Sequence, residues 1–334
     1  MLSAEDSGKR CGSNLLFIQM TYTPPRISII VPSYNHEGHL KKRLDTLFNQ
    51  TFGDFEVILL DDASTDGSKK ILEAYADRPQ VSHFLVNTEN SGGAFQQWKK
   101  GIRLAEGEYI WIAESDDFSD RNFLETLMEV FERDRNVDLV FCASWYVDDK
   151  DNKQKPAPDP EESFTISGPG VIQKYFSRYN LIRNAGSCVF KRKLVDPTFY
   201  EYAYFRYCGD WQFWADLAGR AWKIAYLNKR LNYFRIHDRN VSTEAEKKGL
   251  YFREGIRIAK GILKDEQIKE VARDQIYRFW GLKLNEAIFS RKDIKWGIRV
   301  RILIESFFDR NPIFRYTLWN HKTKKKLKRL LWRG

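Results

Sequence analysis

Five short apolar runs, each separated from the next by a stretch with helical periodicity, constrain the fold of this chain more than any other feature. The runs are rich in β-branched and aromatic residues, and they lack the alternation of apolar and polar residues that marks a half-buried strand. They lie at residues 27–31, 55–60, 81–86, 109–113 and 137–142. Strands that alternate with helices at this spacing predict a mostly parallel sheet covered by helices on both faces.

The segments between these runs have apolar residues at the spacing of a helix. Residues 39–49, for example, place leucine at every third or fourth position. We expect further helices after Asp66, a typical N-cap residue, between the glycine turn at 90–93 and residue 105, and at 120–134. The sequence therefore predicts an α/β unit whose helices alternate regularly with strands.

After residue 142 the alternation is looser. Residues 150–163 are polar and contain three prolines, and we expect a mobile loop over or beside the functional site. The later elements that we expect are a strand within 187–191, a helix at 210–221, a strand at 224–231, an irregular segment at 234–242 and helices from about residue 244. The predicted fold is thus a Rossmann-like sheet with a C-terminal helical extension.

Composition excludes several classes of protein. Of the 334 residues 15% are aromatic, which argues against a disordered chain. No stretch approaches the ~20 apolar residues that are needed to cross a bilayer. The four cysteines, Cys11, Cys142, Cys188 and Cys208, lack metal-site spacing, and the last three lie among apolar or aromatic residues. We therefore expect core thiols and a cytoplasmic protein.

Positive charge is concentrated near the C-terminus. The 44 residues from Arg291 hold 14 Lys/Arg and three Asp/Glu, whereas the rest of the chain is close to neutral. Clustered lysines at 322–329 precede Leu330, Leu331 and Trp332, which is the composition of a helix at a membrane interface. We expect this tail to bind an anionic membrane surface, peripherally at the inner face of the cell membrane. The alternative is a solvated helix that packs on the rest of the chain.

Polar and acidic residues follow three of the predicted strands, at the sheet edge where ligands bind to open parallel sheets. They are Pro32-Ser33-Tyr34-Asn35, Asp61-Asp62 and Asp116-Asp117. Paired acids at a strand end suit Mg²⁺ or Mn²⁺, or hydrogen bonds to a base or a ribose. No glycine-rich phosphate loop follows the first strand, which argues against P-loop and Rossmann dinucleotide binding.

The order of these motifs resembles a known family. ISIIVPSYN, LFNQTFGDFEVILLDDASTDGS and NSGGAFQQWKKGIRLAEGEYIWIAESDD resemble the successive signatures of family 2 glycosyltransferases of the GT-A fold. CGDWQFWADLA and NYFRIHDRNVS resemble the family's catalytic-base and closing segments. The resemblance covers about residues 26–242. It implies an inverting, metal-assisted transfer of a sugar from a UDP- or dTDP-linked donor to a hydroxyl of a glycan or lipid-linked acceptor.

The resemblance also implies a donor site. Tyr34 stands where the family stacks an aromatic ring on the base, and Asp61 stands where an acid accepts a hydrogen bond from a pyrimidine. Asp116 matches the acid that binds the ribose or the sugar, and Asp117 matches the acid that holds the cation. Pro32 and Gly92 complete the implied donor-binding residues. Each position has a structural alternative: a strand-end ring, a turn acid, or a glycine turn before a helix.

Two later residues are implied in the chemistry. Asp210 matches the general base, and nearby Trp and Phe side chains would raise its pKa toward working pH. Its structural alternative is the N-cap of the same helix. His237 matches a residue near the diphosphate or the metal. The chain departs from the family pattern at Glu114, where an Asp is frequent, and at Gly209, where an acid often precedes the base.

The resemblance divides the chain into three parts: a flexible leader (1–25), a transferase domain (26–243, with nucleotide-binding and acceptor halves at 26–149 and 164–243), and a basic helical region (244–334). Two other functions remain open at this point. A sugar-phosphate nucleotidylyltransferase would need a basic glycine-rich loop after the first strand, and a non-catalytic protein would bind nucleic acid or membrane through its tail. No recognised nucleic-acid module occurs in the sequence, so we do not expect a nucleic-acid partner.

Overall fold

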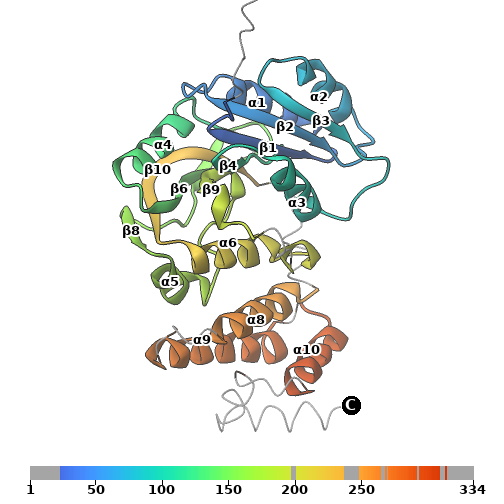
Figure 1. Ribbon diagram of the computed structural model, residues 1–334. Coiled ribbons are helices and arrows are strands. Elements are labelled where there is room, and N and C mark those ends of the chain that lie inside the picture. Colours follow the sequence, from blue (N-terminus) through green and yellow to red (C-terminus); the bar gives the residue numbers. More distant parts are fainter. Residues whose placement is uncertain are drawn as a thin grey trace, which may run out of the picture.

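The computed structural model has a central ten-stranded sheet with helices on both faces and further helices beneath it (Figure 1). It describes residues 23–196, 201–236, 248–264, 268, 270–291, 293–308 and 313. The strand order is β3-β2-β1-β4-β9-β6-β10-β5, with β7 paired to β6 and β8 paired to β10. The α/β class and the helical C-terminal region are confirmed.

Four parallel strands form the N-terminal half of the sheet, as the apolar runs predict. They are β1 (Ile27–Ser33), β2 (Phe55–Asp61), β3 (Val81–Val86) and β4 (Tyr109–Ile112). Ile29 and Val31 of β1 enter one core, and Ile30 between them enters the core on the opposite face. β1, β2 and β4 show no alternation because both of their faces are buried, whereas β3, at the edge of the sheet, has no fully buried residue.

Helices cover the two faces of the sheet. On one face lie α1 (Glu37–Phe48), α2 (Ser68–Ala76) and α4 (Phe123–Arg133), and on the other lie α3 (Ala94–Leu104) and α6 (Gly209–Arg220). Each of these helices confirms a segment that helical spacing predicts. Burial of both apolar faces of the central strands against these helices is the main favourable contribution to the stability of this half of the fold.

The second half of the sheet is mixed in direction. Its strands are β5 (Phe118–Ser119), β6 (Val137–Val147), β7 (Lys153–Pro156), β8 (Phe164–Ser167), β9 (Cys188–Lys191) and β10 (Lys223–Arg235). β6 and β10 are parallel, whereas β9 runs antiparallel between β4 and β6. Both long strands extend beyond the predicted bounds, into residues 143–147 and 232–235 at the carboxyl-terminal edge of the sheet.

The prediction of a loop at 150–163 is wrong for four of its residues. β7 pairs antiparallel with the end of β6 as an edge strand. All four side chains of β7 are exposed, so the strand has no buried face and leaves no apolar pattern in the sequence. The pairing fixes the hairpin turn at 148–152, which approaches the candidate site described below.

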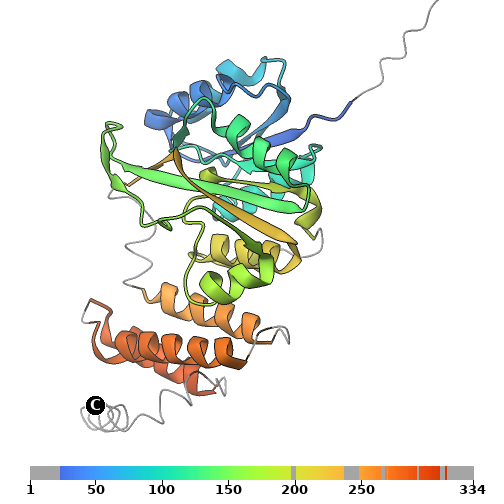
Figure 2. The ribbon, with the colours of Figure 1, turned by 90° about the vertical axis from the view of Figure 1, so that its left-hand side faces the viewer.

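The remaining helices fill the lower part of the molecule (Figures 1 and 2). Short helical segments occur at Gly168–Val171 (α5), Ile172–Phe176, Ala185–Ser187, Arg192–Leu194 and Glu201–Tyr204. The C-terminal helices are α8 (Leu250–Leu263), α9 (Glu270–Phe289) and α10 (Trp296–Phe308). Trp280 and Ile302 belong to the same hydrophobic cluster as Trp98 of α3. The C-terminal helices are therefore continuous with the core under the sheet.

Two further expectations can be compared with the described residues. Cys142, Cys188 and Cys208 are buried free thiols, as expected. No helix in the part of the chain that the structure describes is long and apolar enough to cross a membrane. Residues 1–22, which form most of the expected leader, and the lysine cluster at 322–329 lie outside the described residues.

The packing of α8 against two tryptophan rings gives a stability prediction. A Cβ atom added at Gly255 would lie 2.4 Å from Cη2 of Trp280 and 3.2 Å from Cζ3 of Trp211, both of which are fully buried. We expect Gly255→Ala to lower the free energy of unfolding by about 1–3 kcal/mol through overpacking, as measured by urea denaturation. The matched control is Gly261→Ala in the same helix, where a Cβ meets nothing within 4 Å and should be neutral or stabilising. Equal stability of the two variants would contradict the close approach of α8.

Candidate functional site

A cavity of about 730 Å³ lies where the carboxyl end of β4 meets the N-termini of α3 and α6. Four of the sequence-predicted residues line it together: Gly92, Asp116, Asp117 and Asp210. The other charged or polar residues in its wall are Glu114, Arg183, Asn184, Arg206, Tyr207 and Lys248. Residues separated by more than 150 positions in the sequence thus line one cavity, and its wall includes Leu250 of α8.

Three carboxylates crowd the end of β4. Asp117 is buried; its Oδ1 accepts a hydrogen bond from the backbone N–H of Arg235 (2.8 Å), and its Oδ2 accepts one from Nδ2 of Asn184 (2.5 Å). Oε1 of Glu114 accepts a hydrogen bond from the indole N–H of Trp98 (2.7 Å). Burial, and then the charge of Asp116, raise the pKa of Glu114 to about 8 and also raise the pKa of Asp117. Each acid therefore disfavours the ionised form of its neighbours.

Two buried arginines offset part of this negative charge. Arg43 reaches from α1 under the acids; its Nε donates to the carbonyl of Glu114 (2.7 Å), and its guanidinium lies 5.5 Å from the ring centre of Trp111. Burial lowers the pKa of Arg43, and Asp117, Asp116 and Glu114 oppose that change. At the end of β10, Nε of Arg235 donates to the carbonyl of Asp116 (2.8 Å). Neither arginine was expected from the sequence.

The acids at the end of β4 are candidate ligands for a divalent cation. Within the described residues, no group of three or more His, Cys, Asp or Glu has an arrangement that could hold a metal ion alone. Burial is the main cause of the raised pKa values of Glu114 and Asp117, and the charge of Asp116 raises both further. Asp116 is partly exposed in the cavity wall, whereas Asp117 has both oxygens in hydrogen bonds. The donor set fits a cation that takes its remaining ligands from a bound anion.

Tyr34 and Asp61 lie at the neighbouring strand ends, outside the wall of this cavity. In the β1–β2 register Asp61 is paired with Ser33, the residue that precedes Tyr34 in the chain. Oδ2 of Asp61 accepts a hydrogen bond from the backbone N–H of Ser64 (2.9 Å), and its buried Oδ1 has no partner among the described residues. Tyr34 is 44% exposed, so it does not fill the core edge. Pro32 is buried within β1.

The turn that carries Gly92 is held by Asp62. The carboxylate of Asp62 accepts hydrogen bonds from Asn87, Ser91 and Gln97, so this acid has the structural role expected of a turn residue. Gly92 has φ 93°, in the left-handed region that favours glycine. The glycine turn therefore both starts α3 and lines the cavity.

Asp210 lies in the first turn of α6, with its carboxylate held from two sides. Its Oδ1 accepts a hydrogen bond from the backbone N–H of Trp211 (2.7 Å), and its Oδ2 accepts one from Nδ2 of Asn180 (2.7 Å). Cys208, and not Asp210, is the N-cap of this helix, so the structural alternative for Asp210 is wrong. Burial raises the pKa of Asp210 to about 7.

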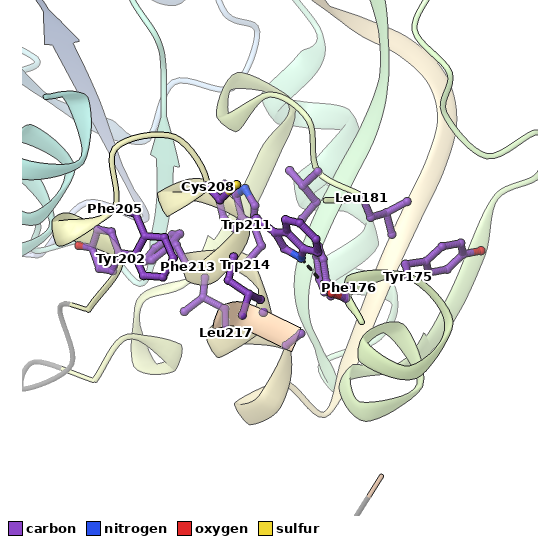
Figure 3. Packing of buried hydrophobic residues seen from close by; sticks show 14 of the residues in the cluster. Tyr175, Phe176, Leu181, Tyr202, Phe205, Cys208, Trp211, Phe213, Trp214 and Leu217 are labelled. Carbon is purple, nitrogen blue, oxygen red and sulfur yellow. Dashed lines mark hydrogen bonds between the residues drawn. The ribbon is translucent and has the colours of Figure 1, made fainter. Parts of the chain in front are cut away.

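The apolar side chains around α6 are the source of that burial (Figure 3). Trp211 and Trp214 follow Asp210 in the helix and are 1% and 0% exposed. Gly209, where the family often places an acid, has no room for a side chain: an added Cβ would lie 2.5 Å from the ring of Phe95 and 2.6 Å from the carbonyl oxygen of Tyr202. His237 lies outside the described residues.

Sequence reasoning missed several polar residues of the site, including Arg43, Asn180, Asn184 and Arg235. Asn184 shows why. Its amide binds Asp117, and its Oδ1 accepts a hydrogen bond from Asn232, 48 residues away in the sequence (3.1 Å). No local pattern marks such a residue, because each contact joins elements that are distant in the sequence.

Comparisons with known proteins give a consistent result. The model of the family "Glycosyl transferase family 2" matches residues 28–197. An uncharacterized glycosyltransferase of Methanocaldococcus jannaschii is 27% identical over 230 residues, which cover 68% of this chain and 77% of the relative. The glycosyltransferase GlyG of Streptococcus pneumoniae is 38% identical over 128 residues, which cover 37% of this chain and 41% of the relative. The chain thus spans less than half the length of the second relative.

Solved structures share the fold. Residues 1–349 of S. aureus TarS, in complex with UDP-GlcNAc, match with a TM-score of 0.66 at 19% identity, over 86% of this chain and 82% of that one. The mannosyltransferase PcManGT from Pyrobaculum calidifontis, in complex with GDP-Man and Mn²⁺, matches with a TM-score of 0.53 at 16% identity, over 94% of this chain and 89% of that one.

Proposed function

Because this chain belongs to glycosyl transferase family 2 and is therefore a sugar-transferring enzyme, we propose that it moves a sugar from a nucleoside diphosphate to an acceptor hydroxyl with inversion at the anomeric carbon. One observation carries the proposal: the acids at the end of β4 and the held carboxylate of Asp210 line the same cavity. No observation favours nucleotidyl transfer or a non-catalytic role.

The donor is proposed to be linked to a uridine or thymidine diphosphate. The unpartnered Oδ1 of Asp61 is a buried acceptor at the end of β2, suited to an N–H of a pyrimidine ring. The exposed ring of Tyr34, one residue beyond the paired Ser33, is available for stacking on that base. The complex of TarS, whose fold this chain shares, with UDP-GlcNAc supports this choice.

The resemblance assigns the cation to Asp117 and the ribose or sugar to Asp116; we propose instead that Asp116, with Asp117 beside it, holds Mg²⁺ or Mn²⁺. Asp116 is half-buried in the cavity wall and so faces the ligand, whereas the carboxylate of Asp117 is buried beside it. When bound, the cation would neutralise the charge that develops on the leaving diphosphate. The Mn²⁺ complex of PcManGT supports the use of such a cation.

Asp210 is proposed as the general base. Its carboxylate accepts the proton of the acceptor hydroxyl while that oxygen forms a bond to the anomeric carbon and the bond from that carbon to the diphosphate oxygen breaks. Asn180 and the N–H of Trp211 orient the carboxylate. A pKa of about 7 suits a base at neutral pH, because the ionised form is populated and still attracts a proton.

The acceptor is proposed to be a glycan or a lipid-linked molecule near an anionic membrane surface. The basic C-terminal tail supports membrane association, since each Lys or Arg near an anionic leaflet contributes about 1 kcal/mol. A peripheral enzyme with this tail would meet a lipid-linked acceptor at the surface where it resides.

The metal assignment can be tested by binding and by activity. We expect EDTA to abolish transfer and Asp116→Asn to remove the increase in UDP affinity that Mn²⁺ produces, as measured by calorimetry. The matched control is Asp77→Asn on the surface at the end of α2, which should retain that increase. Full transfer in excess chelator would exclude a metal-dependent mechanism.

Asp210→Asn separates binding from chemistry. The substitution is nearly isosteric but removes the ionisable base, so turnover should fall by ~10²–10⁴ while donor affinity persists. In the unmodified enzyme, kcat should fall as pH drops through about 7, since protonation of Asp210 removes the base. Steady-state kinetics across pH check both expectations, and turnover within a few-fold of the unmodified enzyme would show that another group is the base.

The tail assignment is tested by co-sedimentation with vesicles. We expect the full chain to sediment with anionic liposomes, less so at high salt, because the attraction is electrostatic and screened. A chain truncated after residue 311 should stay in the supernatant while it still binds UDP. Equal sedimentation of the two chains would show that the tail is not the anchor.

A further inference from the structure

A carboxylate from the C-terminal helices binds the loop that leads into the α6 helix. Glu254 of α8 accepts three backbone hydrogen bonds: Oε1 from the N–H of Arg206 (3.0 Å), and Oε2 from the N–H groups of Tyr207 (3.0 Å) and Cys208 (2.7 Å). Cys208 is the N-cap of α6, two residues before Asp210. Three successive amides that converge on one carboxylate form an anion-binding turn within the protein.

The packing behind this contact leaves α8 little freedom. Gly255, next to Glu254, lies against the rings of Trp280 and Trp211. Those two rings stack with centroids 5.8 Å apart, and their indole N–H groups donate to the carbonyls of Ser177 and Phe176 (2.9 Å each). Figure 3 shows Trp211 directed toward Phe176 and Cys208 at the start of the same helix. Docking of α8 therefore fixes where the Glu254 carboxylate lies relative to α6.

We infer that Glu254 is a positioning residue for the general base, through which the C-terminal helices hold Asp210 and the rim of the cavity in their working geometry. The inference rests on the proposed function, because it assigns Asp210 as the base. Arg206 and Tyr207, whose amides Glu254 binds, line the cavity together with Asp210. A shift of this loop would therefore move the cavity wall and the base together.

The charge of Glu254 gives a second effect that a purely structural contact would lack. It raises the pKa of Asp210, after the larger effect of burial. The other titratable groups that line the cavity around Asp210 are Glu114, Asp116, Asp117, Arg183, Arg206, Tyr207 and Lys248. Because a negative neighbour disfavours the ionised carboxylate, removing this charge should lower the pKa of Asp210. The acid limb of the kcat profile should then move to lower pH.

Two substitutions separate the effect of the charge of Glu254 from the effect of its side-chain length. Glu254→Gln keeps the length but loses the charge and one acceptor; we expect kcat to fall about tenfold, the donor KM to stay within twofold, and the acid limb to move down by about half a pH unit. Glu254→Asp keeps the charge but is one methylene shorter; we expect kcat to fall while the acid limb stays in place. The matched control is Glu305→Gln, which breaks an ion pair with Arg253 of α8 and does not touch the loop.

Each outcome decides the inference. If Glu254→Gln has the kcat and pH profile of Glu305→Gln, Glu254 does not position the base. If kcat falls equally in all three variants with no change in any pH profile, the effect is general loss of packing, and the inference is overturned. Should Glu254→Gln fail to fold, Glu254→Asp decides by the same kcat and KM measurements. Failure of the proposed function is recognised separately, because Asp210→Asn would then retain turnover.

Discussion

The crowding of three carboxylates at the end of β4, with Asp117 buried and Glu114 and Asp116 half-buried, is the constraint on which much of the remaining structure depends. Charged groups taken out of water cost several kcal/mol each unless partners compensate them. Here the partners come from every side: Arg43 from α1, Asn184 from the segment before β9, and Arg235 from the end of β10. Under the proposed function, the acids and oriented donors of this cluster would hold a cation and its anionic ligand.

The sequence predicts the elements that bury both faces and misses those that bury none. Continuous apolar runs identify β1, β2 and β4, because helices cover both sides of those strands. β7 has four exposed side chains, so its pairing with β6 depends on backbone hydrogen bonds that leave no sequence pattern. The strand-end acids could be predicted for the same reason. An apolar run shows where a buried strand ends, and a carboxylate directly after that end can be recognised in the sequence.

The supporting residues could not be predicted, since their partners are distant in the sequence. Arg43 is a single basic residue in an amphipathic helix, and nothing near it indicates that its guanidinium lies under acids 71 and more residues away. Asn180 and Glu254 approach the Asp210 segment from opposite directions along the chain. Such contacts depend on the completed sheet and the docked helices, whereas a helix or strand pattern is set within about ten residues.

Gly209 stands where the family often places an acid, and the packing around it bears on the position of Glu254. A side chain at that position would collide with Phe95 and with the carbonyl of Tyr202, so close packing of α3 against the start of α6 excludes an acid there. Glu254 instead brings a carboxylate to the amides just ahead of this position, from a helix that the sequence pattern assigns to a separate C-terminal region. The boundary expected at residues 243–244 passes through one hydrophobic cluster, which contains both Trp211 and Trp280. A negative charge that no side chain could supply at residue 209 is thus supplied from α8.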